Sequence, residues 1–164
     1  MRVIRLMSLL VIVVSIFNAG CLKDGYDTFT CTAKLPEINV PAAEITQVEA
    51  YLTANNITNA VKHPTGLYYI IENEGTGNRP TLCTNVAFTY KGQLTNGTIF
   101  DQATNPVLFP LGQLITGWQI GIPLVKSGGK IRLFIPPSLG YGSRVVSSIP
   151  ANSVLIFDVT VIEG

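Results

Sequence analysis

Few side chains in this sequence could perform nucleophilic or acid–base catalysis, and their settings argue against it. The only histidine is His63, and Ser138 lies in the segment Pro-Pro-Ser-Leu-Gly, which is not a nucleophile-elbow pattern. Hydrolase chemistry of the Ser-His type is therefore disfavoured, and we interpret His63 as a solvated loop residue.

Two glycine-containing segments could suggest phosphate binding, but neither has a complete motif. Residues 75–80 (GTGNRP) contain two glycines of a dinucleotide-binding pattern without the third, and residues 128–131 (GGKI) are not a phosphate loop. The 11 Lys and Arg and the 10 Asp and Glu are spread without long runs, so there is no basic footprint for nucleic acid. We expect turns at both glycine segments and no nucleic-acid partner.

The cysteines also lack a catalytic or metal-binding spacing. No C-x-x-C motif and no Cys/His pattern points to redox catalysis or zinc, so we predict no metal and no cofactor. In an oxidising compartment Cys31 and Cys83 could form a disulfide between the N-terminal segment and the domain. Two unrelated thiols remain the alternative.

The N-terminus has the pattern of an export signal. Arg2 and Arg5 precede an apolar run over residues 6–17, which is shorter than the roughly 20 residues of a membrane-spanning helix. Residues 18–21 (NAGC) resemble a bacterial lipoprotein processing site, although asparagine stands where leucine is usual. We predict a signal peptide over residues 1–20 and lipidation of Cys21; secretion with Cys21 as a thiol or disulfide partner is the alternative.

A tether with one short helix is expected to follow. Residues 22–41 mix charged residues, Gly, Thr and two prolines without periodicity, whereas over residues 42–56 the side chains of Ile45, Val48 and Leu52 recur at helical spacing. We predict that this helix packs on the domain, with a role in dimerisation as the alternative. The predicted organisation is signal peptide 1–20, tether 21–64 and domain 65–164.

From residue 66 onward the pattern is that of β-strands. Apolar residues alternate with others over 86–91, 130–135 and 153–162, and residues 67–71 are rich in aromatic and β-branched side chains. Between these strands, Trp118 and Ile122 share one face of a short helix before Pro123 limits its continuation. The expected fold class is α+β, an antiparallel sheet closed by a short helix.

In sequence order, a series of motifs resembles the FK506-binding-protein family of peptidyl-prolyl cis-trans isomerases. The motifs are 86–92 (VAFTYKG), 96–101 (NGTIFD), 111–112 (LG), 117–118 (GW), 121 (G), 128–130 (GGK), 135–137 (IPP), 140–142 (GYG), 149–150 (IP) and 155–159 (LIFDV). The resemblance covers roughly residues 65–164. It implies a twisted antiparallel sheet wrapped around one short helix, with a prolyl-binding pocket and isomerase activity on exported proteins.

The resemblance also implies roles for individual residues. It makes Trp118 the floor of the pocket, gives the Tyr141 hydroxyl and the backbone N–H of Ile149 or its neighbour as donors to substrate, and has Asp101 orient the pocket through Tyr90. The catalytic set is Tyr90, Asp101, Trp118, Tyr141 and Phe157, and the substrate-binding set is Phe100, Val107, Leu114, Ile115 and Ile149.

Three features depart from the family pattern. Val107 stands where an aromatic residue is common, the stretch 112–117 is shorter than in many members, and the loop 143–148 has no aromatic cap. A non-catalytic proline-binding chaperone and a scaffold lipoprotein of the same fold are therefore the alternatives.

The expected partners are proline-containing segments of exported proteins, FK506-like macrolides and a membrane reached through Cys21. The expected location is the bacterial outer membrane facing the periplasm, with surface exposure as the alternative.

Overall fold

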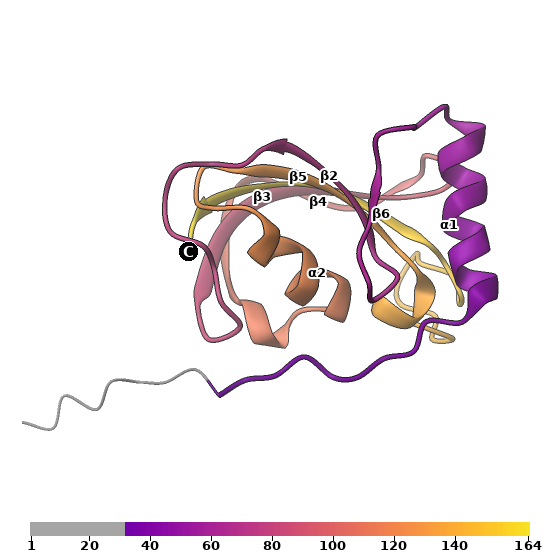
Figure 1. The fold of residues 1–164 in the computed structure, drawn as a ribbon, viewed down its shortest axis with the longest axis horizontal. Coiled ribbons are helices and arrows are strands. Elements are labelled where there is room, and N and C mark those ends of the chain that lie inside the picture. The colour runs from indigo at the N-terminus through magenta and orange to yellow at the C-terminus, as the bar shows by residue number, and fades with distance from the viewer. Residues whose placement is uncertain (1–31) are drawn as a thin grey trace, which may run out of the picture.

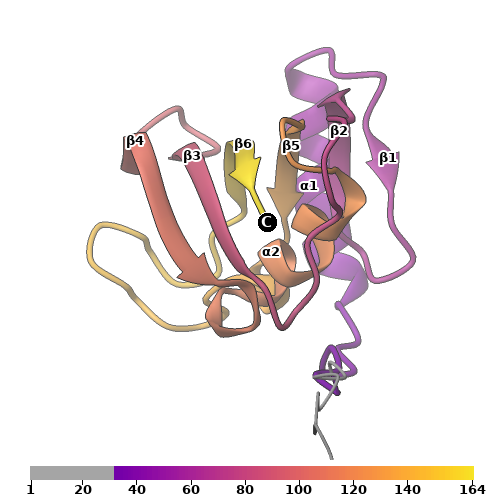
Figure 2. The same cartoon turned by 90° about the vertical axis from the view of Figure 1, so that its left-hand side faces the viewer.

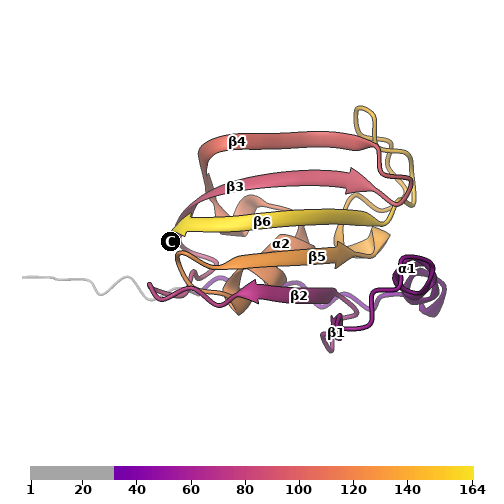
Figure 3. The same cartoon turned by 90° about the horizontal axis from the view of Figure 1, so that it is seen from above.

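A computed structural model describes residues 32–164 of the chain. The predictions for the signal peptide 1–20, for Cys21 and for Cys31 fall outside these residues. The described part contains one antiparallel sheet of six strands in the order β1-β2-β5-β6-β3-β4, together with short helices (Figures 1 and 3). The predicted fold class, an antiparallel sheet with a short helix, is confirmed.

The strands follow the alternation seen in the sequence. Their bounds are Val61–Lys62 (β1), Tyr68–Asn73 (β2), Asn85–Leu94 (β3), Ile99–Pro110 (β4), Lys130–Ile135 (β5) and Leu155–Glu163 (β6). β6 lies between β5 and β3, and its residues Leu155, Phe157, Val159 and Val161 are buried on the inner face. The final strand is therefore central, as predicted.

The inner face of the sheet is covered by α2 (Thr116–Gly121), which continues into the 3-10 turn Ile122–Leu124 (Figures 1 and 2). Gly117 and Gly121 allow this close packing, because a Cβ at Gly117 would lie 2.6 Å from Ile135 and one at Gly121 would lie 2.5 Å from Leu133. The helix thereby carries Trp118 into the core formed with β3, β5 and β6.

The predicted N-terminal helix is α1 (Ala42–Ala54), and it packs on the domain. Val48 and Leu52 join a second core with Tyr68, Phe134, Val154 and Ile156, at the end of the sheet where β5 ends and β6 begins (Figure 1). The helix ends where Asn56 adopts a positive φ of 54° and the Ile57 N–H donates to the Leu52 carbonyl, a Schellman-type termination.

The folded unit therefore begins before residue 65, the predicted domain boundary. β1 pairs with β2, α1 completes the second core, and Ile38 and Val40 pack against the main core. The motifs from residue 65 onward lie in the sheet, in α2 and in the loops between them, and none of them includes a residue of α1. Within residues 32–164, no helix has the length and apolar character needed to cross a membrane.

Candidate functional site

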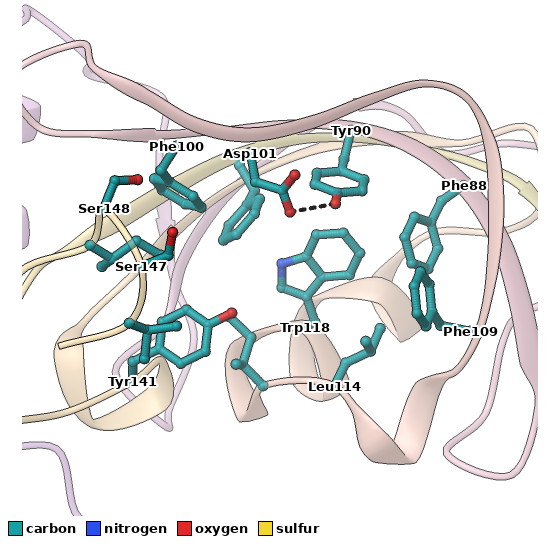
Figure 4. A pocket seen from close by; sticks show the side chains of 14 residues that line it. Phe88, Tyr90, Phe100, Asp101, Phe109, Leu114, Trp118, Tyr141, Ser147 and Ser148 are labelled. Carbon is teal, nitrogen blue, oxygen red and sulfur yellow. Dashed lines mark hydrogen bonds between the residues drawn. The ribbon is translucent and has the colours of Figure 1, made fainter. Parts of the chain in front are cut away.

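A cavity of about 440 Å³ opens between the inner face of the sheet, α2 and the loop after β5 (Figure 4). Aromatic and aliphatic side chains form most of its wall, with only a few polar groups. The lining residues are Phe88, Tyr90, Phe100, Asp101, Phe109, Leu114, Ile115, Trp118, Tyr141, Val146, Ser147, Ser148, Ile149 and Phe157. All five predicted catalytic residues are among them.

Trp118 forms the floor of this cavity and is held by three other rings in edge-to-face contact. Its ring centroid lies 4.7 Å from that of Phe88, 5.4 Å from that of Tyr90 and 5.1 Å from that of Phe157. Edge-to-face packing of this kind fixes an aromatic ring more tightly than its buried area alone would. The indole N–H of Trp118 is buried and has no hydrogen-bond partner within residues 32–164.

The polar wall is a pair formed by Tyr90 on β3 and Asp101 on β4. The Tyr90 hydroxyl donates a 2.6 Å hydrogen bond to Oδ2 of Asp101 (Figure 4). Burial is the larger cause that raises the pKa of Tyr90, and the hydrogen bond to the Asp101 carboxylate raises it further. The phenol therefore stays protonated over a wide pH range, and its hydroxyl is held by the Asp101 carboxylate.

Gly92 leaves room for the rings of Phe100 and Phe157 to come into contact. It is paired with Asp101 on β4 and with Phe157 on β6, and a Cβ at this position would lie 2.7 Å from the rings of both Phe100 and Phe157. Phe100 and Phe157 make an edge-to-face contact with centroids 5.4 Å apart. Any larger residue at position 92 would push these rings into the cavity.

The rim at Leu114 and Ile115 is held by a side chain that sequence reasoning missed. Gln119 on α2 donates from Nε2 to the carbonyl of Leu114 at 2.6 Å and to that of Gly112 at 3.2 Å. This brace fixes the shortened stretch 112–117. Ile115 lines the cavity, and its backbone N–H donates to no group of the described chain.

The opposite rim is the loop that carries Tyr141 and Ile149. Both residues line the cavity as predicted, but the Ile149 N–H already donates to the Val146 carbonyl at 2.8 Å. The Ile149 N–H is therefore not free for a substrate, whereas the N–H of its neighbour Ser148, the other donor expected on this loop, donates to no group of the described chain. Val146 lines the cavity, while Val145 is 71% exposed.

Val107, predicted as a substrate-binding residue, does not line the cavity. It lies opposite Phe88 and packs against the core, while Phe109, two residues further along β4, stacks on Phe88 with ring centroids 6.1 Å apart. Phe88 and Phe109 therefore supply an aromatic wall, although position 107 itself is a valine. The alternating pattern of β4 was the available signal, because residues 107 and 109 share one face of the strand.

This arrangement suits binding an apolar ring and hydrogen-bonding the peptide groups beside it. Among the described residues that line the cavity, the Tyr141 hydroxyl and the Ile115 N–H donate to no acceptor within residues 32–164, and neither is a nucleophile activated by a base. Ser138 hydrogen-bonds to Glu44 and His63 to Thr65, and neither residue lines the cavity. Within residues 32–164 no cluster of His, Cys, Asp and Glu could hold a metal ion.

The sheet, the helix beneath it and the aromatic cavity define a prolyl isomerase fold of the FK506-binding type. The sequence model of the FKBP-type peptidyl-prolyl cis-trans isomerase matches residues 77–162, just over half of the chain. The chain belongs to this family.

Relatives of known sequence and of known structure support this family membership. The FKBP-type peptidyl-prolyl cis-trans isomerase FkpA of Aeromonas hydrophila is 44% identical over 115 residues, which are 68% of this chain and 43% of that protein. The crystal structure of FkpA from Escherichia coli has a TM-score of 0.68 at 36% identity, covering 74% of this chain and 59% of that one. A peptidyl-prolyl cis-trans isomerase structure from Pseudomonas syringae pv. tomato has a TM-score of 0.65 at 27% identity, covering 77% and 97%. The chain spans well under half the length of the curated relatives it matches.

Proposed function

We propose that this protein is a peptidyl-prolyl cis-trans isomerase that accelerates X-Pro isomerisation during the folding of exported proteins. The observation that carries the proposal is the Trp118 floor, enclosed by Tyr90, Phe100 and Phe157 and flanked by two free hydrogen-bond donors. A proline ring fits such an apolar floor, while the donors can reach carbonyl groups on either side of it.

The reaction requires no covalent step. Rotation about an X-Pro bond has a barrier of about 18–20 kcal/mol because the amide has partial double-bond character. A dry aromatic cavity favours the twisted amide, whose carbonyl has lost resonance and polarity, over the planar ground state. The Tyr141 hydroxyl and the Ile115 N–H would hold the neighbouring carbonyls while the bond rotates.

Refolding of a protein whose slow phase is limited by a non-native proline isomer tests this against the binding-only alternative. An isomerase accelerates the slow phase at substoichiometric concentration, whereas a chaperone without turnover changes the yield only near equimolar concentration. The expected result is acceleration by residues 22–164 at a tenth of the substrate concentration, lost in Asp101→Ala/Trp118→Leu. An altered yield with an unaltered rate would favour the chaperone, and no effect on either would favour the scaffold.

We further propose that the protein is anchored to the bacterial outer membrane, facing the periplasm, through a lipidated Cys21. The export pattern of residues 1–20 and the processing-site resemblance support this. Expression of the full chain with labelled palmitate should label the wild type and leave Cys21→Ser unlabelled. Label in neither protein would favour ordinary secretion, and protease accessibility on intact cells would distinguish the cell surface from the periplasmic face.

We also propose a disulfide between the two cysteines other than Cys21. Cys83 is disulfide-bonded, and we propose Cys31 as its partner; non-reducing peptide mapping should recover the linked pair.

The cavity should also bind FK506-like macrolides, because its apolar floor and two donors suit a pipecolyl ring with adjacent carbonyls. Without an aromatic cap on loop 143–148, we expect this binding to be weaker than in family members that have one.

A further inference from the structure

Glu44, on the first turn of α1, reaches the loop that carries Tyr141. One carboxylate oxygen accepts a 2.8 Å hydrogen bond from the backbone N–H of Ser138, and the other accepts a 2.6 Å bond from its hydroxyl. The two residues are 94 positions apart in the sequence, and both side chains are half-buried. Charge-assisted bonds of this kind are stronger than neutral ones, and two parallel bonds also fix orientation.

Ser138 is part of the structure that places Tyr141. It lies in the 3-10 turn Pro137–Leu139, whose Pro137 carbonyl accepts hydrogen bonds of 2.9 Å from the N–H groups of both Gly140 and Gly142. Tyr141 thus lies between Gly140 and Gly142, which both hydrogen-bond to the turn that contains Ser138. Glu44 is bonded to this same turn. From there its side chain projects into the cavity opposite Trp118 (Figure 4).

α1 provides a fixed support for this contact. Val48 and Leu52 are buried against the second core, and Glu49 on the outer side of the helix accepts hydrogen bonds from Tyr68 and Lys62. The Glu44 carboxylate is therefore anchored by a helix that is itself packed on the sheet. The helix lies outside the part of the chain that matches the family, residues 77–162.

We propose that Glu44 is a positioning residue for the isomerase site, acting through Ser138 to hold the Tyr141 hydroxyl at the cavity. This inference rests on the proposed isomerase activity and deepens it. It makes α1 a functional part of the catalytic unit in addition to its packing role. A substrate carbonyl needs a donor at a defined place, and a small displacement of that donor lowers the rate steeply.

The test uses residues 22–164, which keep every described element, and a proline tetrapeptide. Glu44→Ala should lower kcat/KM about tenfold, whereas Ser138→Ala, which keeps the backbone N–H bond, should lower it less. In a Tyr141→Phe background, Glu44→Ala should change kcat/KM by less than about twofold, because the group it positions is gone. Gln47→Ala, at an exposed position of the same helix, is the control, and its kcat/KM should equal that of the wild type.

Amide hydrogen exchange gives a second readout that does not depend on turnover. Exchange of residues 139–144 should be faster in Glu44→Ala and unchanged in Gln47→Ala. An active wild type with an equally active Glu44→Ala variant would overturn the inference, as would a loss that is undiminished in the Tyr141→Phe background. An inactive wild type would instead overturn the proposed function, and the exchange result alone would then decide whether Glu44 orders the loop.

Discussion

The hydroxyl of Tyr90 and Oδ2 of Asp101 lie 2.6 Å apart although the two residues do not face each other in the sheet. Tyr90 is paired with Ala103, and Asp101 is paired with Gly92, so the bond runs diagonally across β3 and β4. Diagonal neighbours on one face of a sheet lie within reach of long side chains. The absence of a side chain at Gly92 leaves room for the rings that pack beside this bond.

Replacing Asp101 should therefore disturb the site more than the fold. Asp101→Ala leaves the Tyr90 hydroxyl without its acceptor, and we expect kcat/KM for a proline peptide to fall about tenfold. Asp101→Asn, which keeps one acceptor oxygen, should lose less. Gln102→Ala is the neighbouring control, because residue 102 points to the other face of β4. Equal losses in the position 101 and 102 variants would mean that the strand, and not the Tyr90 bond, is responsible.

The raised pKa of Tyr90 predicts the behaviour of the protein at alkaline pH. The unfolded chain releases the phenolic proton near pH 10, whereas the folded protein retains it to higher pH because of burial and the bond to Asp101. Stability linked to this group is therefore complete below pH 10 and is lost as the pH rises above it.

The measurement is the free energy of unfolding in urea between pH 8 and pH 11. The wild type should lose stability above pH 10 more steeply than Tyr90→Phe, which has no phenol to titrate. Parallel pH profiles for the two proteins would show that the pKa of Tyr90 is the same in the folded and unfolded states.

Much of the fold and site could be predicted from the sequence, because local patterns determine them. Alternation identified β3, β5 and β6, helical spacing of Val48 and Leu52 identified α1, and the ordered family motifs identified the cavity floor. The apolar residues Phe134 and Ile156 on the outer face were also a signal that something covers that end of the sheet.

The rest depends on geometry that the sequence does not encode locally. Pairing shifts register between Phe88 and Tyr90, where β4 carries extra residues, and the alternation of the two strands does not reveal this shift. The bond between Ile149 and Val146 belongs to a loop without a repeating pattern. The contact between Glu44 and Ser138 joins distant segments and has no sequence motif.

The close approach of α2 to β5 predicts an unusual response to alanine. Gly121→Ala should raise helix propensity by roughly 1 kcal/mol, yet its Cβ would lie 2.5 Å from Leu133. We expect a net destabilisation of about 1–3 kcal/mol in urea unfolding, because the helix must move away from the sheet. The double variant Gly121→Ala/Leu133→Val, with a shorter side chain opposite, should recover part of the loss. Additive effects of the two substitutions would argue against the steric explanation.

The second core predicts that α1 contributes to the stability of the domain. Phe134 is fully buried beneath the helix, with its ring 6.1 Å from that of Tyr51, so Phe134→Ala should cost about 3–5 kcal/mol. In a chain that begins at residue 65, the same substitution should cost much less, because loss of α1 already uncovers the ring. Equal costs in the long and short chains, measured by urea unfolding, would show that α1 does not stabilise the sheet.

The most direct test of the central claim is the cis–trans exchange rate of a proline tetrapeptide at equilibrium, measured by NMR with a catalytic amount of residues 22–164. The Trp118 cavity predicts exchange well above the uncatalysed rate, reduced sharply in Asp101→Ala/Trp118→Leu and blocked by an FK506-like ligand. Exchange at the uncatalysed rate in the presence of the folded wild-type protein would contradict the account.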